Sequence, residues 1–337
     1  MRELIQELAE AWGPSGFEHH VRELIRAEVE PLADEVYVDA LGNLICRIGD
    51  GERRVMTMAH MDEIGLIVSH IDQQGFARFA SLGTLFPSTL VGARVRFENG
   101  VIGTIGMENQ FTQRRNLPAT GGFYIDISTA GTNDDHTDGD AVVQIGDPGA
   151  FVADVVWRGD RVIGKSLDDR LGCAIQIEVM RRIREQGTPH TLYFVFSVQE
   201  EVGSRGAGPA AFGIEPDLAL VLDMTTTGDQ PKIKPMPVKL GAGAAIKTRD
   251  TGQIVPAAVK NLIVQRADEA GIPYQFEVLE LGSTDGETIQ VARSGVPTGA
   301  ISVPVRYVHT QSETADWHDI QAVTDLYVAV LSQDIDL

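Results

Sequence analysis

The chain has few cysteines and few basic residues for its length. Its 337 residues include only 2 cysteines, Cys46 and Cys173. This number excludes a disulfide framework and a cysteine-based zinc site, and it is typical of a reducing compartment. Lysine plus arginine number 28 against 48 aspartates plus glutamates, which gives a net charge of −20. Nucleic acid is therefore not expected as a partner, because phosphate binding needs a basic surface.

Long hydrophobic runs are also lacking. No stretch approaches the roughly 20 apolar residues of a membrane span. The opening segment, MRELIQEL, places acids among apolar residues at helical spacing. That pattern differs from the uninterrupted apolar segment of a signal peptide. We therefore expect a cytoplasmic protein with no membrane partner.

The two ends of the chain show alternating helix and strand patterns. The length suggests roughly two domains. Amphipathic helices, short β-branched runs and a hairpin signature follow one another, which indicates a mixed sheet with helices on both faces. Helices are expected at 3–12, 18–30, 171–185, within 254–271 and at 320–332; a hairpin is expected at 35–48, and strands at 55–59, 193–198, 218–222, 274–279 and 298–303.

The middle of the chain has a different residue pattern. Between residues 67 and 156 the segments are short, β-branched and interrupted by glycine, with hardly any helical periodicity. We predict a small all-β barrel domain here, inserted into a catalytic α/β domain made of residues 1–66 and 157–337. The expected barrel strands include 93–97, 101–105, 124–127 and 141–145.

Histidines and carboxylates recur where the predicted strands end. Parallel strands place their carboxyl ends along one edge of a sheet, where ligands bind. Taken singly, a histidine is more often a surface group, and an aspartate before a helix is often an N-cap. Repetition at equivalent positions favours a metal site, and a mixture rich in carboxylates suits a hydrolytic pair of zinc, cobalt or manganese ions. The residues are His60, Asp62, Glu200, Glu201, Asp223 and His309, with Asp168 and Asp169 before a predicted helix.

Several longer motifs then point to a known family. They are HMDEIG at 60–65, LDDRLG at 167–172, QEEVG at 199–203 and VRYVHT at 305–310, together with Leu222-Asp223, GSTDG at 282–286 and YIDI at 124–127. In this order they resemble the tetrahedral (TET-type) aminopeptidases. These are dinuclear metallopeptidases of the zinc-exopeptidase kind, also known as glutamyl or deblocking aminopeptidases. The resemblance covers essentially the whole chain.

The resemblance implies a role for each site residue. Asp168 would bridge two divalent metals, Zn²⁺ or Co²⁺, with Mn²⁺ as a third option. His60 and Asp223 would complete one metal's ligands, and Glu201 and His309 the other's. Asp62 would hold the second imidazole nitrogen of His60, and Glu200 would be the general base.

The resemblance also implies a substrate and an assembly. The enzyme would remove N-terminal residues from short peptides. The inserted domain would mediate dimerisation, and dimers would form a hollow twelve-subunit particle. The preferred N-terminal residue and the metal used in the cell stay open.

Other polar residues receive weaker expectations. Asp169 is expected to have a structural task in an unusual backbone turn. Glu63 could lie near the site, but a surface salt bridge is favoured for it. Ser283, Thr284 and Asp285 could line the substrate pocket or simply form a turn. His318 is expected to flank the last helix. Five histidines receive no role, and the last three are predicted to lie at the surface: His19, His20, His70, His136 and His190.

Three alternative functions are weighed against a peptidase. An aminoacylase or deacetylase would use the same metal pair. An endoglucanase would need two carboxylates on opposite sides of a sugar, about 5–10 Å apart, and adjacent Glu200 and Glu201 do not supply them. A non-catalytic scaffold would have no need of a base such as Glu200.

Overall fold

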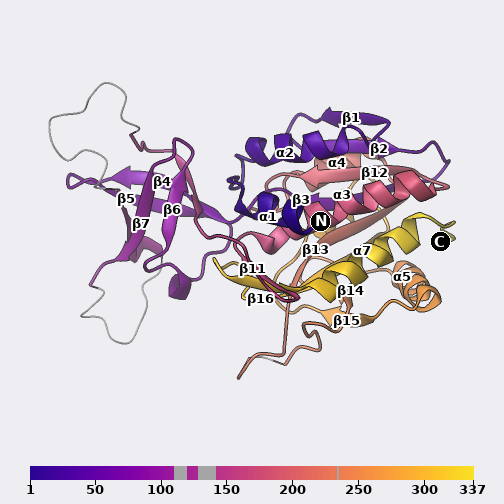
Figure 1. Cartoon of the computed structure of the whole chain (residues 1–337). Coiled ribbons are helices and arrows are strands. Elements are labelled where there is room, and N and C mark those ends of the chain that lie inside the picture. The colour runs from indigo at the N-terminus through magenta and orange to yellow at the C-terminus, as the bar shows by residue number, and fades with distance from the viewer. Residues whose placement is uncertain (110–119, 128–141, 234) are drawn as a thin grey trace.

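The computed structural model describes residues 1–109, 120–127, 142–233 and 235–337, which form a large α/β part and a smaller barrel (Figure 1). The α/β part is built on an 11-stranded sheet in the order β1-β2-β12-β3-β13-β16-β17-β11-β10, with β14 and β15 attached beside β16. The strands are β1 (Glu35–Val38), β2 (Leu44–Ile48), β3 (Arg54–His60), β10 (Val156–Arg158), β11 (Arg161–Gly164), β12 (Thr191–Ser197), β13 (Leu218–Thr226), β14 (Ala244–Arg249), β15 (Tyr274–Val278), β16 (Thr298–Arg306) and β17 (Glu313–Asp316).

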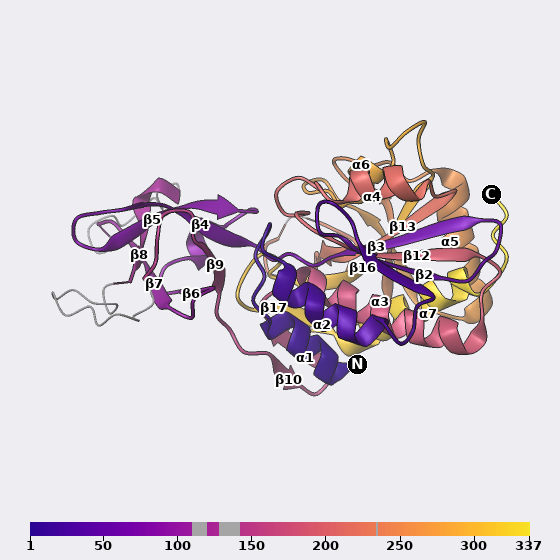
Figure 2. The ribbon, with the colours of Figure 1, turned by 90° about the horizontal axis from the view of Figure 1, so that it is seen from above.

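Helices cover both faces of this sheet. They are α1 (Arg2–Glu10), α2 (His19–Val29), α3 (Leu167–Gln186), α4 (Ala207–Ile214), α5 (Ala257–Ala270), α6 (Gly286–Ile289) and α7 (Trp317–Leu331). Seen from above, α1, α2, α3 and α7 lie on one face, and α4 and α6 lie on the other (Figure 2). The expected mixed sheet with helices on both faces is therefore confirmed.

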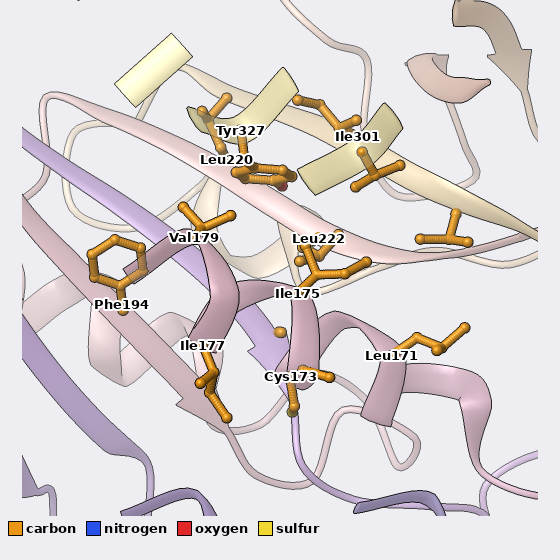
Figure 3. Packing of buried hydrophobic residues seen from close by; sticks show 14 of the residues in the cluster. Leu171, Cys173, Ile175, Ile177, Val179, Phe194, Leu220, Leu222, Ile301 and Tyr327 are labelled. Carbon is orange, nitrogen blue, oxygen red and sulfur yellow. The ribbon is translucent and has the colours of Figure 1, made fainter. Parts of the chain in front are cut away.

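The apolar runs of the central strands follow from this layering. Val55 and Ala59 of β3 belong to the core under α3, whereas Met56 and Met58 belong to the core under α4. A strand that is buried on both faces is apolar at nearly every position, so its sequence is a near-continuous hydrophobic run. Figure 3 shows the larger core, where side chains of α3 such as Ile175 and Val179 pack against the sheet.

The parallel pairing of the central strands positions the site. β12 and β13 both run parallel to β3, and β16 runs parallel to β13. Ser197, the last residue of β12, pairs with His60, the last residue of β3. The residues that follow β3 and β12 therefore emerge at the same edge of the sheet.

The smaller part is a closed antiparallel barrel in the order β4-β5-β8-β7-β6-β9. Its strands are β4 (Gly65–Ile71), β5 (Phe76–Leu82), β6 (Arg94–Phe97), β7 (Ile102–Met107), β8 (Phe123–Asp126) and β9 (Pro148–Phe151). It encloses a hydrophobic core of its own, with Val95, Phe97 and Ile125 among its buried residues. The inserted barrel is confirmed as a fold. Its role as a dimerisation domain remains a prediction.

The predicted elements differ from the structure at two strands. β13 continues to Thr226, so Asp223 lies within the strand and not after its end. The continuation is stabilised by pairing with β16, which extends to Arg306. The strand expected at 141–145 was wrong over residues 142–145, which form no strand, and residue 141 lies outside the described residues. Among the helices that the structure describes, none is long and apolar enough to cross a membrane.

Candidate metal centre and active site

The two predicted sets of metal ligands converge at the carboxyl edge of the central strands. One set of donor atoms comes from His60, Asp168 and Asp223, and the other from Asp168, Glu201 and His309. Within each set the donor atoms lie within 4.8 Å of one another. Asp168 belongs to both: its Oδ1 lies 3.2 Å from His60 Nε2, and its Oδ2 lies 3.4 Å from His309 Nε2. The shared carboxylate therefore stands between the two sets. These residues and Glu200 line a cavity of about 570 Å³.

Each predicted ligand reaches this place from a different element. His60 ends β3, Glu201 follows β12, and Asp223 lies inside β13. Asp168 begins α3, and its peptide bond to Asp169 is cis. His309 lies beyond β16 in a left-handed conformation with φ of 62°. The site therefore depends on the packing of α3 against the sheet as much as on the strand ends.

Asp62 connects the end of β3, which carries His60, to the loop after β12, which carries Glu200 and Glu201. Its carboxylate accepts the backbone N–H groups of Glu200 at 3.0 Å and of Glu201 at 3.1 Å, and the Ser15 hydroxyl at 2.5 Å. Nδ1 of His60 lies 3.1 Å from the Asp62 carbonyl oxygen and 3.4 Å from its carboxylate. Asp62 therefore fixes both the direction of the His60 ring and the loop that carries the two glutamates.

Burial and mutual proximity shift the pKa values of the acids and histidines at this site. Burial raises the pKa of Glu200, of Glu201 and of Asp223 above the ordinary values, because the protein interior disfavours their charged forms. Burial also favours a neutral His309, but the carboxylates of Glu201 and Asp168 outweigh it and raise the pKa of His309 to about 12. Crowded carboxylates with two imidazoles form a donor set that suits a pair of divalent cations.

Glu313 was missed by the sequence reasoning, yet it holds two of the predicted ligands. Its Oε2 accepts the N–H of Asp168 at 3.0 Å, and its Oε1 accepts the N–H of His309 at 2.8 Å. Burial, followed by the charge of Asp168, raises its pKa to about 8. The only local sequence signal is weak: Glu313 is an acid four residues after His309.

Two further buried acids support the loop before Glu200. Glu18 accepts the N–H of Gln199 at 3.0 Å, and burial, followed by the charge of Asp62, raises its pKa to about 7. Asp285 accepts the Ser197 hydroxyl at 2.6 Å, and burial raises its pKa to about 6. Of the segment left open between pocket and turn, Ser283 lines the cavity and Asp285 is buried beside it.

Asp169 has the structural task that was expected of it. It is fully buried, and its carboxylate accepts the N–H groups of His60 and Gly172, each at 3.0 Å. Burial raises the pKa of Asp169 well above its ordinary value. The side chain thus joins the end of β3 to the first turn of α3. This link sets the separation between His60 and Asp168.

The surface salt bridge predicted for Glu63 was wrong, because Glu63 is buried. It is 1% exposed and contacts Lys165 Nζ at 2.7 Å and the Ser166 hydroxyl at 2.6 Å. Its second oxygen accepts the N–H of Gly13 at 3.1 Å. The acid is buried because the barrel connection, the N-terminal loop and the start of α3 meet there. Sequence spacing does not reveal such a meeting point.

Replacing Lys165 with methionine is expected to destabilise the protein by about 3 kcal/mol, because the buried Glu63 carboxylate loses its ammonium partner. This value is near the lower end of the cost of breaking a buried ion pair. Arg170 Nη2 remains 3.7 Å from Glu63 and limits the loss. Urea unfolding measures this change. The double variant Lys165→Met/Glu63→Gln should recover part of the stability, since it removes both charges of the pair and leaves the Arg170 guanidinium hydrogen-bonded to backbone carbonyl oxygens. A double variant less stable than the single one would contradict this account.

The other histidines separate into buried and exposed groups. His190 was predicted at the surface but is buried, with Nε2 lying 2.9 Å from the carbonyl oxygen of Gln333. The C-terminal segment covers it, which the local sequence does not show. His318 flanks the start of α7, as expected, and donates its N–H to Asp316. His70 is exposed, and His136 lies outside the described residues.

Comparison with known proteins gives consistent matches. Residues 42–326 match the family of M42 glutamyl aminopeptidases. A putative aminopeptidase of Acetivibrio thermocellus is 42% identical over 331 residues, covering 98% of each chain. An aminopeptidase structure from Desulfurococcus kamchatkensis has a TM-score of 0.92 and 32% identity, covering 98% of this chain and 94% of that one. The TET1 peptidase of Pyrococcus horikoshii, which can assemble into a tetrahedron or a large octahedral shell, has a TM-score of 0.86 and 30% identity over 98% of this chain and 99% of that one.

Proposed function

Since the chain belongs to the M42 glutamyl aminopeptidase family and is an aminopeptidase, we propose that its cavity holds two divalent metal ions and hydrolyses the first peptide bond of short peptides. The observation that carries this proposal is the pair of ligand sets that share Asp168. His60 and Asp223 would hold one ion, and Glu201 and His309 would hold the other, with Asp168 contributing to both. Zn²⁺ or Co²⁺ fits the donors best, because imidazole and carboxylate ligands without thiolates suit these ions.

When bound, the two ions acidify a water molecule and polarise the carbonyl group that is attacked. The protein supplies the proton transfer. Glu200 lines the cavity beside Glu201, and its Oε1 lies 3.3 Å from the Ser204 hydroxyl. It accepts the proton that leaves the attacking water and delivers it to the nitrogen of the departing peptide. One water is consumed, and an amino acid and a shortened peptide are released.

The surrounding acids keep Glu200 in place without taking part in the reaction. Asp62 holds the N–H of Glu200, and Glu18 holds the N–H of Gln199 just before it. Gln199 has a φ of 58°, so its backbone is in the left-handed region. Such a conformation persists only where the surroundings hold it. The two hydrogen bonds supply this restraint and direct the Glu200 side chain into the cavity.

The cavity walls fit the N-terminal part of a peptide. Carboxylates of the site attract the free amino group, which carries a positive charge. The wall around them is largely apolar and is formed by Phe86, Met224, Leu279, Leu281 and Val308. A peptide bound by its amino group therefore places its first side chain against apolar surface.

Chelation is expected to abolish the hydrolysis of an aminoacyl-p-nitroanilide, and added Co²⁺ or Zn²⁺ is expected to restore it. The reason is that buried carboxylates alone do not polarise a carbonyl group. Activity is measured by p-nitroaniline release, with circular dichroism to show that the metal-free protein stays folded. Undiminished activity after complete metal removal would sink the metal proposal. N-acetyl-amino acids and carboxymethylcellulose serve as parallel substrates, and preferential turnover of either would favour an aminoacylase or an endoglucanase.

We also propose that the barrel mediates self-association into a dimer-based dodecamer. The support is the match to a peptidase that assembles into a tetrahedral or octahedral shell. A closed particle would admit short unfolded peptides and exclude folded proteins. Light scattering tests this, and a particle of monomer mass at micromolar concentration would overturn it.

A further inference from the structure

A second group of metal-binding side chains lies away from the active site, at the seam between the α/β part and the barrel. His19 and His20 are the first residues of α2, and Glu98 lies in the turn between β6 and β7. Their donor atoms lie within 4.8 Å of one another. None of the three lines the catalytic cavity.

The distances between these donors suit one ion. Nε2 of His19 lies 2.9 Å from Glu98 Oε1, and Nε2 of His20 lies 3.4 Å from the same oxygen. In a tetrahedral zinc site with metal–ligand distances of about 2.0–2.1 Å, neighbouring donors lie roughly 3.3 Å apart. The centroids of the two imidazole rings lie 4.2 Å apart, and the Nε2 atoms of both rings face the same oxygen of Glu98. Small side-chain adjustments bring all three donors around a single ion.

Trp12 packs against both histidines and is hydrogen-bonded to the segment that carries Glu98. Its ring packs edge-on against His19 and His20, with ring centroids 6.3 and 5.7 Å apart. Its indole N–H donates to the carbonyl oxygen of Arg96 at 2.9 Å, two residues before Glu98. The same side chain therefore positions the imidazoles and the turn that carries the carboxylate, which reduces the reorganisation that metal binding requires.

Access and charge favour a cation here. The side chains of His19, His20 and Glu98 are 43%, 55% and 44% exposed, so an ion reaches them from solution. Three protein ligands leave a fourth position for water, as in open zinc sites. The net charge of −20 raises the local concentration of cations near the protein surface.

We propose that His19, His20 and Glu98 form a third divalent metal site, which takes Zn²⁺ or a similar transition metal and clamps α2 to the β6–β7 turn. The segment that it clamps is connected to the catalytic loop, because Glu18 precedes His19 directly and holds the N–H of Gln199. The site is independent of the proposed catalytic metal pair. Its ligands all lie on residues that the peptidase reaction does not use.

The test compares zinc content in the full-length holoenzyme. Wild type and the variants His19→Ala/His20→Ala and Glu98→Gln are equilibrated at micromolar free Zn²⁺, and bound zinc is measured by mass spectrometry. Wild type is expected to hold one equivalent more than either variant. His70→Ala, which removes an exposed barrel histidine outside the site, should retain that equivalent. All these proteins should keep their aminopeptidase activity.

Hydrogen–deuterium exchange provides the second readout. Zn²⁺ is expected to slow amide exchange in the turn around Glu98 in wild type and not in the variants, because only wild type gains the clamp. Equal zinc content in wild type and the double variant would overturn the proposal. So would an additional equivalent that binds only at millimolar Zn²⁺, since a site that weak is adventitious.

Discussion

A Glu200→Gln variant is expected to keep its bound metal and to lose about 10²–10⁴-fold in kcat, the usual contribution of a positioned general base. Glutamine preserves the length and shape of the side chain but does not accept a proton. None of the predicted metal ligands changes. The N–H of residue 200 still donates to Asp62. The loop should therefore keep its conformation while the proton transfer fails.

The measurement combines kcat and KM for an aminoacyl-p-nitroanilide with metal analysis of the same preparation. Glu185→Gln, a substitution of an exposed glutamate on α3, is the matched control and should behave as wild type. A Glu200→Gln enzyme with wild-type turnover would remove Glu200 from the role of base. Loss of metal together with activity would instead assign Glu200 to the metal site.

An Asp168→Asn variant is expected to lose metal at both sites and, with it, nearly all activity. Asp168 contributes to both ligand sets, so one substitution weakens both. The carboxamide is neutral and offers a single oxygen in place of two. Burial alone would raise the pKa of Asp168, but His309 and His60 outweigh it and hold that pKa below its usual range. The wild-type side chain is therefore a carboxylate at neutral pH. Metal analysis after dialysis is the direct measurement.

The control for this variant is Asp154→Asn, which changes an exposed aspartate outside the site. It should retain both equivalents of the catalytic pair and full activity. The Asp168→Asn protein is expected to fold, because the N–H of residue 168 still donates to Glu313. Circular dichroism checks this. If Asp168→Asn kept two equivalents with unchanged affinity, Asp168 would not bridge the two ions.

The sequence alone predicted the central part of the fold. Val55–Ala59 and Tyr193–Val198 are apolar at nearly every position, with Thr57 and Ser197 as the exceptions, because helices bury both faces of the sheet. That pattern is visible without coordinates. The polar residues that follow such strands could be assigned to one edge, because parallel strands end together. The motif around Asp168 supplied the remaining ligand through its resemblance to known peptidases.

Other features depended on contacts that no local pattern reveals. Glu313 reads as one more acid in a loop, but β17 pairs with β11 and β16, and this places Glu313 beneath both Asp168 and His309. Glu63 was predicted at the surface, but the N-terminal loop and the segment before α3 pack around it and bury it. The grouping of His19 and His20 with Glu98 arises only where the barrel meets α2.

The difference has a physical cause. Hydrophobic periodicity records which side of an element faces water, and this is a local property that each segment carries in its own residues. The environment of a buried charge depends on which distant segments pack around it. Asp62 and its partner Ser15 are 47 residues apart in the sequence, and Glu313 and its partner Asp168 are 145 residues apart. The sequence by itself therefore determined the sheet, the barrel and the positions of the predicted ligands. Only the tertiary structure decided which acids hold those ligands in place and where a further group of donors comes together.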